Sequence, residues 1–230
     1  NTVTEMLRAF LCGYEVIARL ARAFEFDELT LHPHGSLAAI GSATAISFLR
    51  NFSKDKIFKT ICTSATLVNP GPFQHAIDGG LIRNIWAGIG ASNGLRAADL
   101  TNVGITGTSK SLYNVFVESF GAKFNAQNMI PELEFQWAVM QSYHKQFACC
   151  QYSHSAVEAV LKILPKFNYK EIEKIRLKTH WRGKLLSNLT PATTLAAKFS
   201  MEHILATSIY HGSANVEAFN SKTLNNNEIK

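Results

Sequence analysis

The chain has 230 residues, of which 47% are apolar and 17% are charged, and its formal net charge is +6. This apolar content is too high for a disordered chain and is normal for one that buries a core. No apolar stretch approaches the ~20 residues that a helix needs to cross a bilayer, so the sequence predicts no membrane span. At ~100–200 residues per domain, the length allows one large domain or two small ones.

The first hundred residues predict helices of two kinds. Thr2 and Glu5 have the spacing of a capping box, and apolar residues at helical spacing follow, which predicts an amphipathic helix over 4–24. Segments 36–49 and 80–103 are instead rich in glycine, alanine and serine. Because small residues let backbones approach closely, these two segments are expected to be buried helices.

Shorter helices and breaks separate these segments. Ser53 is expected to cap a helix that runs to about residue 68. The Asn-Pro-Gly-Pro run at 69–72 then breaks the chain. Thr108 or Ser109 is expected to cap a further short helix that ends near residue 121.

After about residue 129 the pattern changes. The sequence predicts an extended segment at 141–149, helices at 153–164 and 191–210, and a loose polar tail from 220. Residues 172–181 alternate between apolar and polar side chains, which is strand periodicity.

This change of pattern predicts the domain organisation. Helices come first and a mixture of helix and strand follows. We therefore expect a mainly α chain, with a large all-helical domain at 1–135 and a smaller α+β domain at 136–230.

Cysteine usage favours a reducing compartment. Cys12, Cys62, Cys149 and Cys150 form no CxxC pair and have no zinc-finger spacing with histidines. Reduced thiols in a cytoplasmic protein are the preferred interpretation.

Much of the positive charge lies in the segment 162–184, which we call the basic segment. It contains two acids and eight basic residues: Lys162, Lys166, Lys170, Lys174, Arg176, Lys178, Arg182 and Lys184. Nucleic-acid binding is a possible reason for such a cluster. A solvated face is favoured, because no nucleic-acid-binding motif accompanies the charge. An anionic small-molecule substrate also suits this charge balance.

Common catalytic and nucleotide motifs are missing from the sequence. Gly88, Gly90 and Gly94 superficially resemble a dinucleotide fingerprint, but no strand precedes them and the third glycine comes one residue late. We assign them to helix packing. No P-loop, HExxH or GxSxG pattern occurs.

Isolated titratable side chains in apolar or small-residue surroundings are more informative. They are His32, Arg83, Lys145, His154 and His203. A single histidine is more often a structural residue than a catalytic one, so these residues alone assign no function.

Six segments in order carry a resemblance to a known family. They are LCGYEVIARL at 11–20, His32-Pro33 with GSATA at 41–45, RNIWAGIGASNG at 83–94, GITG at 104–107, KQFACC at 145–150 with His154, and PAT at 191–193 with AKFSM at 197–201. Together they resemble the motifs of the MmgE/PrpD family over almost the whole chain. That family includes 2-methylcitrate dehydratase, cis-aconitate decarboxylase and iminodisuccinate epimerase.

The resemblance implies a fold, a substrate class and an assembly. It implies a large helical domain and a smaller α+β domain with the active site between them, in a homodimer that needs no metal or other cofactor. The substrate would be a small anionic polycarboxylate, and neither a membrane nor nucleic acid is expected as a partner. Such an enzyme needs cations to hold carboxylates and an acid or base near the reacting carbon.

The resemblance also implies roles for the five titratable residues. His32 would be a catalytic histidine and Lys145 a catalytic lysine that binds a carboxylate or transfers a proton. His203 stands where many members have tyrosine and could still transfer a proton. Arg83 stands where the family often has lysine, and would bind a carboxylate without acting as an acid or base. His154 would bind substrate.

Three functions are compatible with the resemblance. The first is a lyase that dehydrates a 2-methylcitrate-like substrate or decarboxylates a cis-aconitate-like one, and the second is an epimerase of a dicarboxylate. The third is a non-catalytic member that keeps an anion-binding or partner-binding surface. Family members carry a further helical portion with an active-site Asp and His upstream, and closing helices downstream. The chain is therefore expected to be an internal portion of the family fold.

Overall fold

The computed structural model describes residues 2–130 and 136–229 and divides into two compact units. The first unit contains Asn1–Phe73 and Ile82–Ser142, and the second contains Gln74–Leu81 and Tyr143–Lys230. The boundary expected at 135/136 falls next to residues 131–135, which lie outside the described part of the chain.

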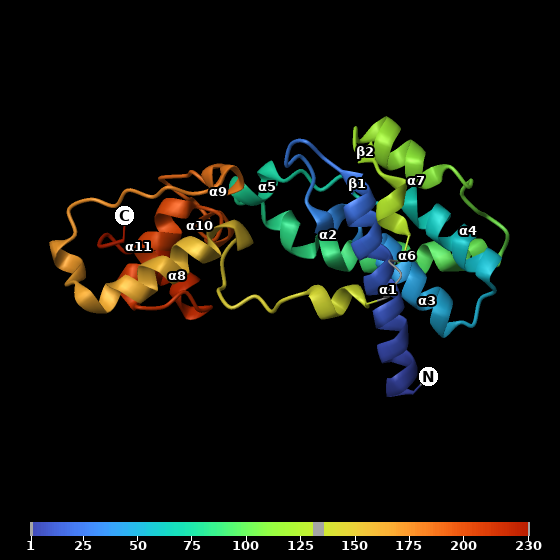
Figure 1. Cartoon of the computed structure of the whole chain (residues 1–230), viewed down its shortest axis with the longest axis horizontal. Coiled ribbons are helices and arrows are strands. Elements are labelled where there is room, and N and C mark those ends of the chain that lie inside the picture. The colour runs from blue at the N-terminus through green and yellow to red at the C-terminus, as the bar shows by residue number, and fades with distance from the viewer. Residues whose placement is uncertain (1, 131–135, 230) are drawn as a thin grey trace. The chain divides into compact units, whose positions relative to one another are not determined.

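Helices make up most of the first unit (Figure 1). They are α1 (Val3–Ala23), α2 (Pro33–Ser36), α3 (Ala38–Leu49), α4 (Lys54–Ala65), α6 (Trp86–Asn102) and α7 (Ser111–Tyr113). A 3-10 turn at Leu81–Ile85 leads into α6, a π-helical turn at Asn114–Ser119 follows α7, and 3-10 turns occur at Ala126–Met129 and Ala138–Gln141. Strand β1 (Phe24–Glu25) pairs antiparallel with β2 (Lys123–Phe124).

The local signals for these helices are largely confirmed. Thr2 and Glu5 form the expected capping box at α1, and the Ser53 side chain accepts the N–H of Lys56 to begin α4. The expected cap at Thr108 or Ser109 is wrong, because α7 begins after Lys110 without a side-chain cap.

The small-residue helices pack as closely as their composition indicates. Helix α3 contacts both α1 and α6, and glycines stand at the two crossings. A Cβ atom at Gly94 would lie 2.6 Å from the Ala43 nitrogen, and one at Gly13 would lie 2.6 Å from the Gly41 oxygen. No side chain fits at these two positions unless the backbones move apart.

The core of the first unit gathers beside these crossings. Leu20, Phe24, Ile40 and Phe116 are buried in one cluster. The Phe24 ring stacks on Phe116 with 5.1 Å between centroids. The core therefore joins α1, α3 and the turn after α7, and fixes the loop that leaves β1.

The second unit is also helical in its described residues. Its helices are α5 (Gln74–Ile77), α8 (His154–Ile163), α9 (Trp181–Lys184), α10 (Thr194–Ala197), α11 (Met201–His211) and α12 (Ser221–Leu224). Short 3-10 turns lie at Gln151–Ser153, Leu164–Lys166, Tyr169–Glu171 and Glu217–Phe219. Its core packs α8 against α11 through Cys149, Val157, Ile204 and Phe219.

The expected strand at 172–181 is wrong, and so is the α+β class of the second domain. No strand is formed in the described residues of the second unit, whose chain from 173 to 180 is exposed and irregular. A strand needs a neighbour that accepts and donates its backbone hydrogen bonds, and no described segment pairs with this one. The alternation of apolar and polar residues at 172–181 therefore predicted a strand that does not form, because it does not specify a pairing partner.

The expected single helix at 191–210 is also wrong, because the segment forms two helices. Thr193 caps α10, and the Ser200 side chain accepts the N–H of His203 and starts α11. Gly212 ends α11 in a left-handed conformation with φ of 63°, as expected.

The tail is more ordered than the sequence indicates. Asn220 caps α12, and Ile229 is 6% exposed. Within residues 2–130 and 136–229, no helix combines the length and the apolar content that crossing a membrane requires.

Candidate functional site

Backbone hydrogen bonds fix His32 at the start of α2. Its N–H donates to the Gly71 carbonyl at 2.8 Å, and the N–H of Phe73 donates to the Thr30 carbonyl at 2.8 Å. Pro33 follows at the first position of α2, where its fixed φ suits a helix. The Asn-Pro-Gly-Pro segment at 69–72 and the residue after it thus hold the backbone around His32 in place through these hydrogen bonds.

Aromatic rings enclose the His32 side chain, which is 7% exposed. Its ring stacks on Phe73 at 5.8 Å and 16°, and meets Trp86 at 5.9 Å and His34 at 4.5 Å. This packing restricts the rotation of the imidazole and sets the directions of its two nitrogens.

Arg83 lies against His32. Its Nη2 atom is 3.1 Å from Nε2 of His32, while the backbone N–H of His34 lies 3.3 Å from Nδ1. A neutral imidazole has one nitrogen that can accept a hydrogen bond. The ring therefore faces two donors and can accept from one of them.

Lys145 and His154 lie close enough in the second unit to interact electrostatically. Burial, followed by the Lys145 charge, holds the pKa of His154 below its usual range, and hydrogen bonding to the backbone of Cys149 and Phe147 opposes this shift. The Nε2 atom of His154 is buried and has no hydrogen-bond partner among the described residues. Burial thus favours the neutral form of His154, and its Nε2 atom is left without a hydrogen-bond partner among the described residues.

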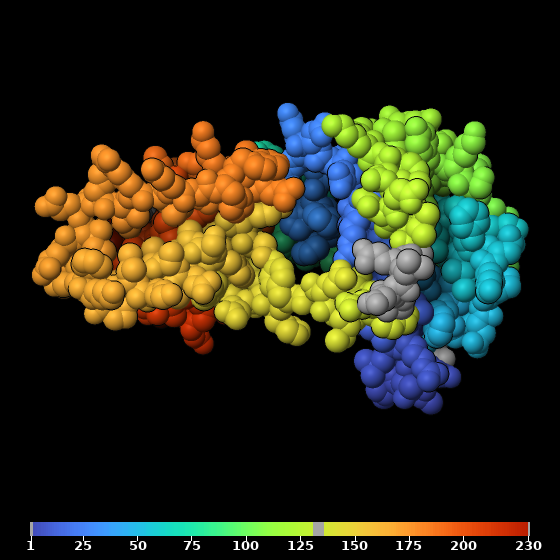
Figure 2. All heavy atoms as spheres, in the orientation of Figure 1, coloured from blue at the N-terminus to red at the C-terminus, as the bar shows by residue number. Residues whose placement is uncertain are grey.

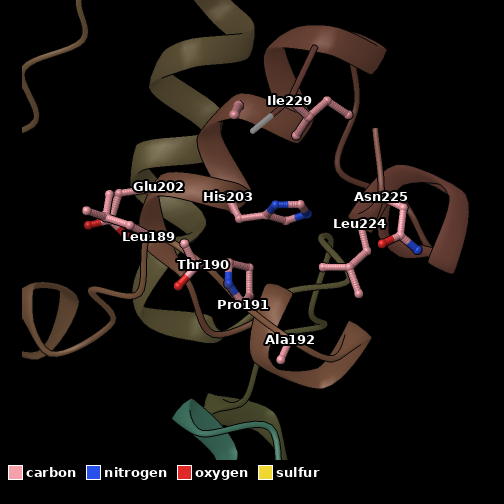
Figure 3. A pocket seen from close by; sticks show the side chains of 10 residues that line it. Leu189, Thr190, Pro191, Ala192, Glu202, His203, Leu224, Asn225 and Ile229 are labelled. Atoms are coloured by element: carbon pink, nitrogen blue, oxygen red, sulfur yellow. The ribbon is translucent and has the colours of Figure 1, made fainter. Parts of the chain in front are cut away.

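His203 projects from α11 into a cavity of about 500 Å³ (Figure 3). The side chain is 6% exposed, and burial lowers its pKa. Its Nε2 atom has no hydrogen-bond partner in the described chain. The other residues that line the cavity are Leu189, Thr190, Pro191, Ala192, Glu202, Ala206, Leu224, Asn225 and Ile229.

The five residues expected from the sequence thus form three local groups. His32 and Arg83 are in contact in the first unit. Lys145 and His154 interact in the second unit, where His203 lines a cavity to which neither of them contributes.

Sequence reasoning missed the part played by His34. Its ring packs on His32 and its N–H faces Nδ1 of that residue. The available signal was position, since His32 stands at the N-cap of a helix, where its side chain can accept from the N–H two residues later.

The described residues contain no group of three or more His, Cys, Asp or Glu side chains placed to hold a metal ion. All four cysteines are free thiols, and burial raises the pKa of Cys149. The ring nitrogens and cations described above are the candidate groups that the sequence singled out.

Comparisons with known proteins give two matches. The model of the MmgE/PrpD N-terminal domain matches residues 1–121, and the model of the MmgE/PrpD C-terminal domain matches residues 147–230. No curated protein matches the sequence at a significant level.

Proposed function

Because the chain belongs to the MmgE/PrpD family, we propose that it is a lyase that acts on a di- or tricarboxylate. The reaction would be dehydration of a 2-methylcitrate-like substrate or decarboxylation of a cis-aconitate-like one. The observation that carries the proposal is the contact between Arg83 and His32.

This pair has the chemistry of a carboxylate site. The Arg83 guanidinium carries a permanent charge and two parallel donors that match a carboxylate. If the N–H of His34 donates to Nδ1 of His32, then Nε2 carries the proton and becomes a second donor beside Arg83. A carboxylate oxygen within hydrogen-bond distance of both nitrogens would accept from both residues, so that neither donor is left without an acceptor.

Three residues of the second unit are also assigned roles in this proposal, on the basis of the family resemblance. Lys145 would either bind a carboxylate through its positive charge or transfer a proton. His154 is neutral and has an open buried Nε2, which suits either a hydrogen bond to substrate or the removal of a proton. His203 is proposed as a further proton-transfer residue, because it stands where many family members have tyrosine.

The proposal is tested with two substrates and matched variants. The chain is incubated with 2-methylcitrate and with cis-aconitate, and ultraviolet absorbance of the C=C bond and release of CO2 are followed. We expect Arg83→Gln to lower kcat/KM by about a hundredfold, since it removes a charged hydrogen bond worth ~1.5–3 kcal/mol. Arg96→Gln changes an exposed arginine of α6 and should leave the rate unchanged.

The same experiment separates the alternatives. Deuterium incorporation from solvent into a dicarboxylate without net product would identify an epimerase. Binding of polycarboxylates without turnover or exchange would identify a non-catalytic member. If cis-aconitate and 2-methylcitrate neither bind nor react, the proposed substrate class is wrong.

A further inference from the structure

The cavity beside His203 has the properties of a ligand site in its own right. Its volume of about 500 Å³ lies within the ~300–1,000 Å³ of small-molecule sites. Leu189, Pro191 and Ala192 form one wall, and Leu224 and Ile229 lie across from them (Figure 3). The cavity thus offers an apolar surface that is large enough for a small organic molecule.

One polar group in this cavity lacks a partner. The Nε2 atom of His203 is buried without a hydrogen bond to any described residue. Leaving a buried polar atom unsatisfied is unfavourable, and a ligand that forms the missing hydrogen bond would remove this cost. Figure 3 shows the ring pointing from α11 toward Leu224 and Asn225, which also line the cavity.

The remaining polar groups of the wall set the charge of the ligand. The Glu202 carboxylate accepts hydrogen bonds from the Ser187 hydroxyl at 2.7 Å and from the Asn188 N–H at 3.1 Å. Burial raises the pKa of Glu202, but these hydrogen bonds outweigh burial and hold the pKa below its usual range. None of the ten described residues that line the cavity is lysine or arginine. An anion would therefore lie near a carboxylate, and none of these ten residues could neutralise it, which is costly in an apolar site.

We propose that this cavity binds an uncharged small molecule with an apolar body and one hydroxyl or carbonyl group, which forms a hydrogen bond with His203. The neutral imidazole can donate to a carbonyl or accept from a hydroxyl. Binding of such a ligand does not require lyase activity. An uncharged ligand is not the polycarboxylate of the proposed lyase reaction, so this binding does not by itself support the proton-transfer role proposed for His203.

Three probes of similar size test the proposal. Cyclohexanol, cyclohexanecarboxylate and methylcyclohexane share a six-membered ring and differ in the attached group. Each is titrated into the full chain while the ring resonances of His203 are followed by NMR. We expect cyclohexanol to shift these resonances saturably and to bind more tightly than the other two compounds.

Variants then assign the binding to the residue and to the cavity. His203→Leu should weaken cyclohexanol binding by about threefold to tenfold, and His203→Gln should retain most of it, because a neutral hydrogen bond contributes ~0.5–1.5 kcal/mol. Ala206→Leu should weaken binding by filling the space without removing the imidazole. His144→Gln changes an exposed histidine of the same unit and should have no effect.

Three results would overturn the proposal. The first is cyclohexanecarboxylate binding more tightly than cyclohexanol, and the second is equal affinity for methylcyclohexane. The third is the absence of any saturable shift at His203. Because the readout is binding, these results leave the outcome of the turnover experiment unaffected.

Discussion

Two hydrogen-bond donors, from Arg83 and His34, compete for the one accepting nitrogen of the neutral His32 imidazole. Arg83 presents a charged donor to Nε2 at 3.1 Å, and the N–H of His34 presents a neutral donor to Nδ1 at 3.3 Å. A charge-assisted hydrogen bond is roughly twice as strong as a neutral one. In the protein without ligand, we therefore expect Nε2 of His32 to accept from Arg83. In that state Nδ1 carries the proton and opposes the His34 N–H.

A bound carboxylate is expected to reverse this tautomer. When an anion takes the hydrogen bonds of Arg83, Nε2 is free to carry the proton and donate to the same anion, while Nδ1 accepts from His34. We expect tricarballylate, an unreactive tricarboxylate, to exchange the protonated and unprotonated nitrogens of His32 in long-range 15N–1H NMR spectra. A bound complex with the free-state tautomer would contradict this mechanism, and His144 serves as the internal control.

Two histidines of the second unit, the partly buried His154 and the buried His203, should make its stability depend on pH. Burial is the largest cause that holds the pKa values of His154 and His203 below the ordinary ~6.5. Below that pH the unfolded chain therefore binds protons that the folded chain does not. The free energy of unfolding should fall as pH is lowered from about 7.5 to about 5.5.

Urea unfolding at several pH values checks this expectation. The fall between about pH 7.5 and 5.5 should be smaller in His154→Gln and in His203→Gln, because each variant removes one group whose proton binding differs between the two states. His144→Gln should keep the full fall. If all three variants show the same fall in unfolding free energy as the unchanged chain, His154 and His203 do not cause it.

At the scale of elements, the close crossing of α3 and α6 depends on Gly94, which has no side chain to hold the two helices apart. A Cβ at Gly94 would meet the Ala43 nitrogen at 2.6 Å, whereas a Cβ at Gly88 on the same helix meets nothing within 4 Å. The two glycines therefore differ in packing and share the same helical backbone.

This difference gives a matched pair of substitutions. Gly94→Ala should destabilise the chain by ~1–3 kcal/mol through overpacking. Gly88→Ala should stabilise it by ~0.5–1 kcal/mol, because alanine has the higher helix propensity and loses less backbone entropy on folding. Denaturant unfolding measures both changes, and equal effects of the two substitutions would contradict the close crossing.

The elements also show what sequence could and could not predict. Helix positions followed from capping residues and periodicity, since Thr2, Ser53 and Gly212 act over three or four neighbours. The strand at 172–181 failed because pairing depends on a distant segment, which alternation does not specify. The resemblance singled out His32 and Arg83 as candidates, and the structure brings them into contact. The donor from His34 could not be predicted, because it depends on where the backbone places an N–H.

At the scale of the whole molecule, the candidate residues are shared between two units that have their own cores. The positive charge is less evenly shared. All eight basic residues of the basic segment are exposed, and the segment lies on the surface of the second unit (Figure 2). Arg182 rests over the rings of Trp181 and Tyr152, at 5.0 and 5.9 Å from the centroids.

This distribution predicts weak, salt-sensitive attraction to nucleic acid. Exposed lysines attract phosphates without fixing a register, and such contacts weaken steeply as salt replaces the released counterions. We expect a short DNA duplex to bind at ~20 mM salt and not at ~150 mM salt in a fluorescence anisotropy assay. The double variant Lys174→Glu with Lys178→Glu should weaken the low-salt affinity by about tenfold or more. Binding that persists at ~150 mM salt would contradict the solvated-face interpretation and identify the basic segment as a nucleic-acid site.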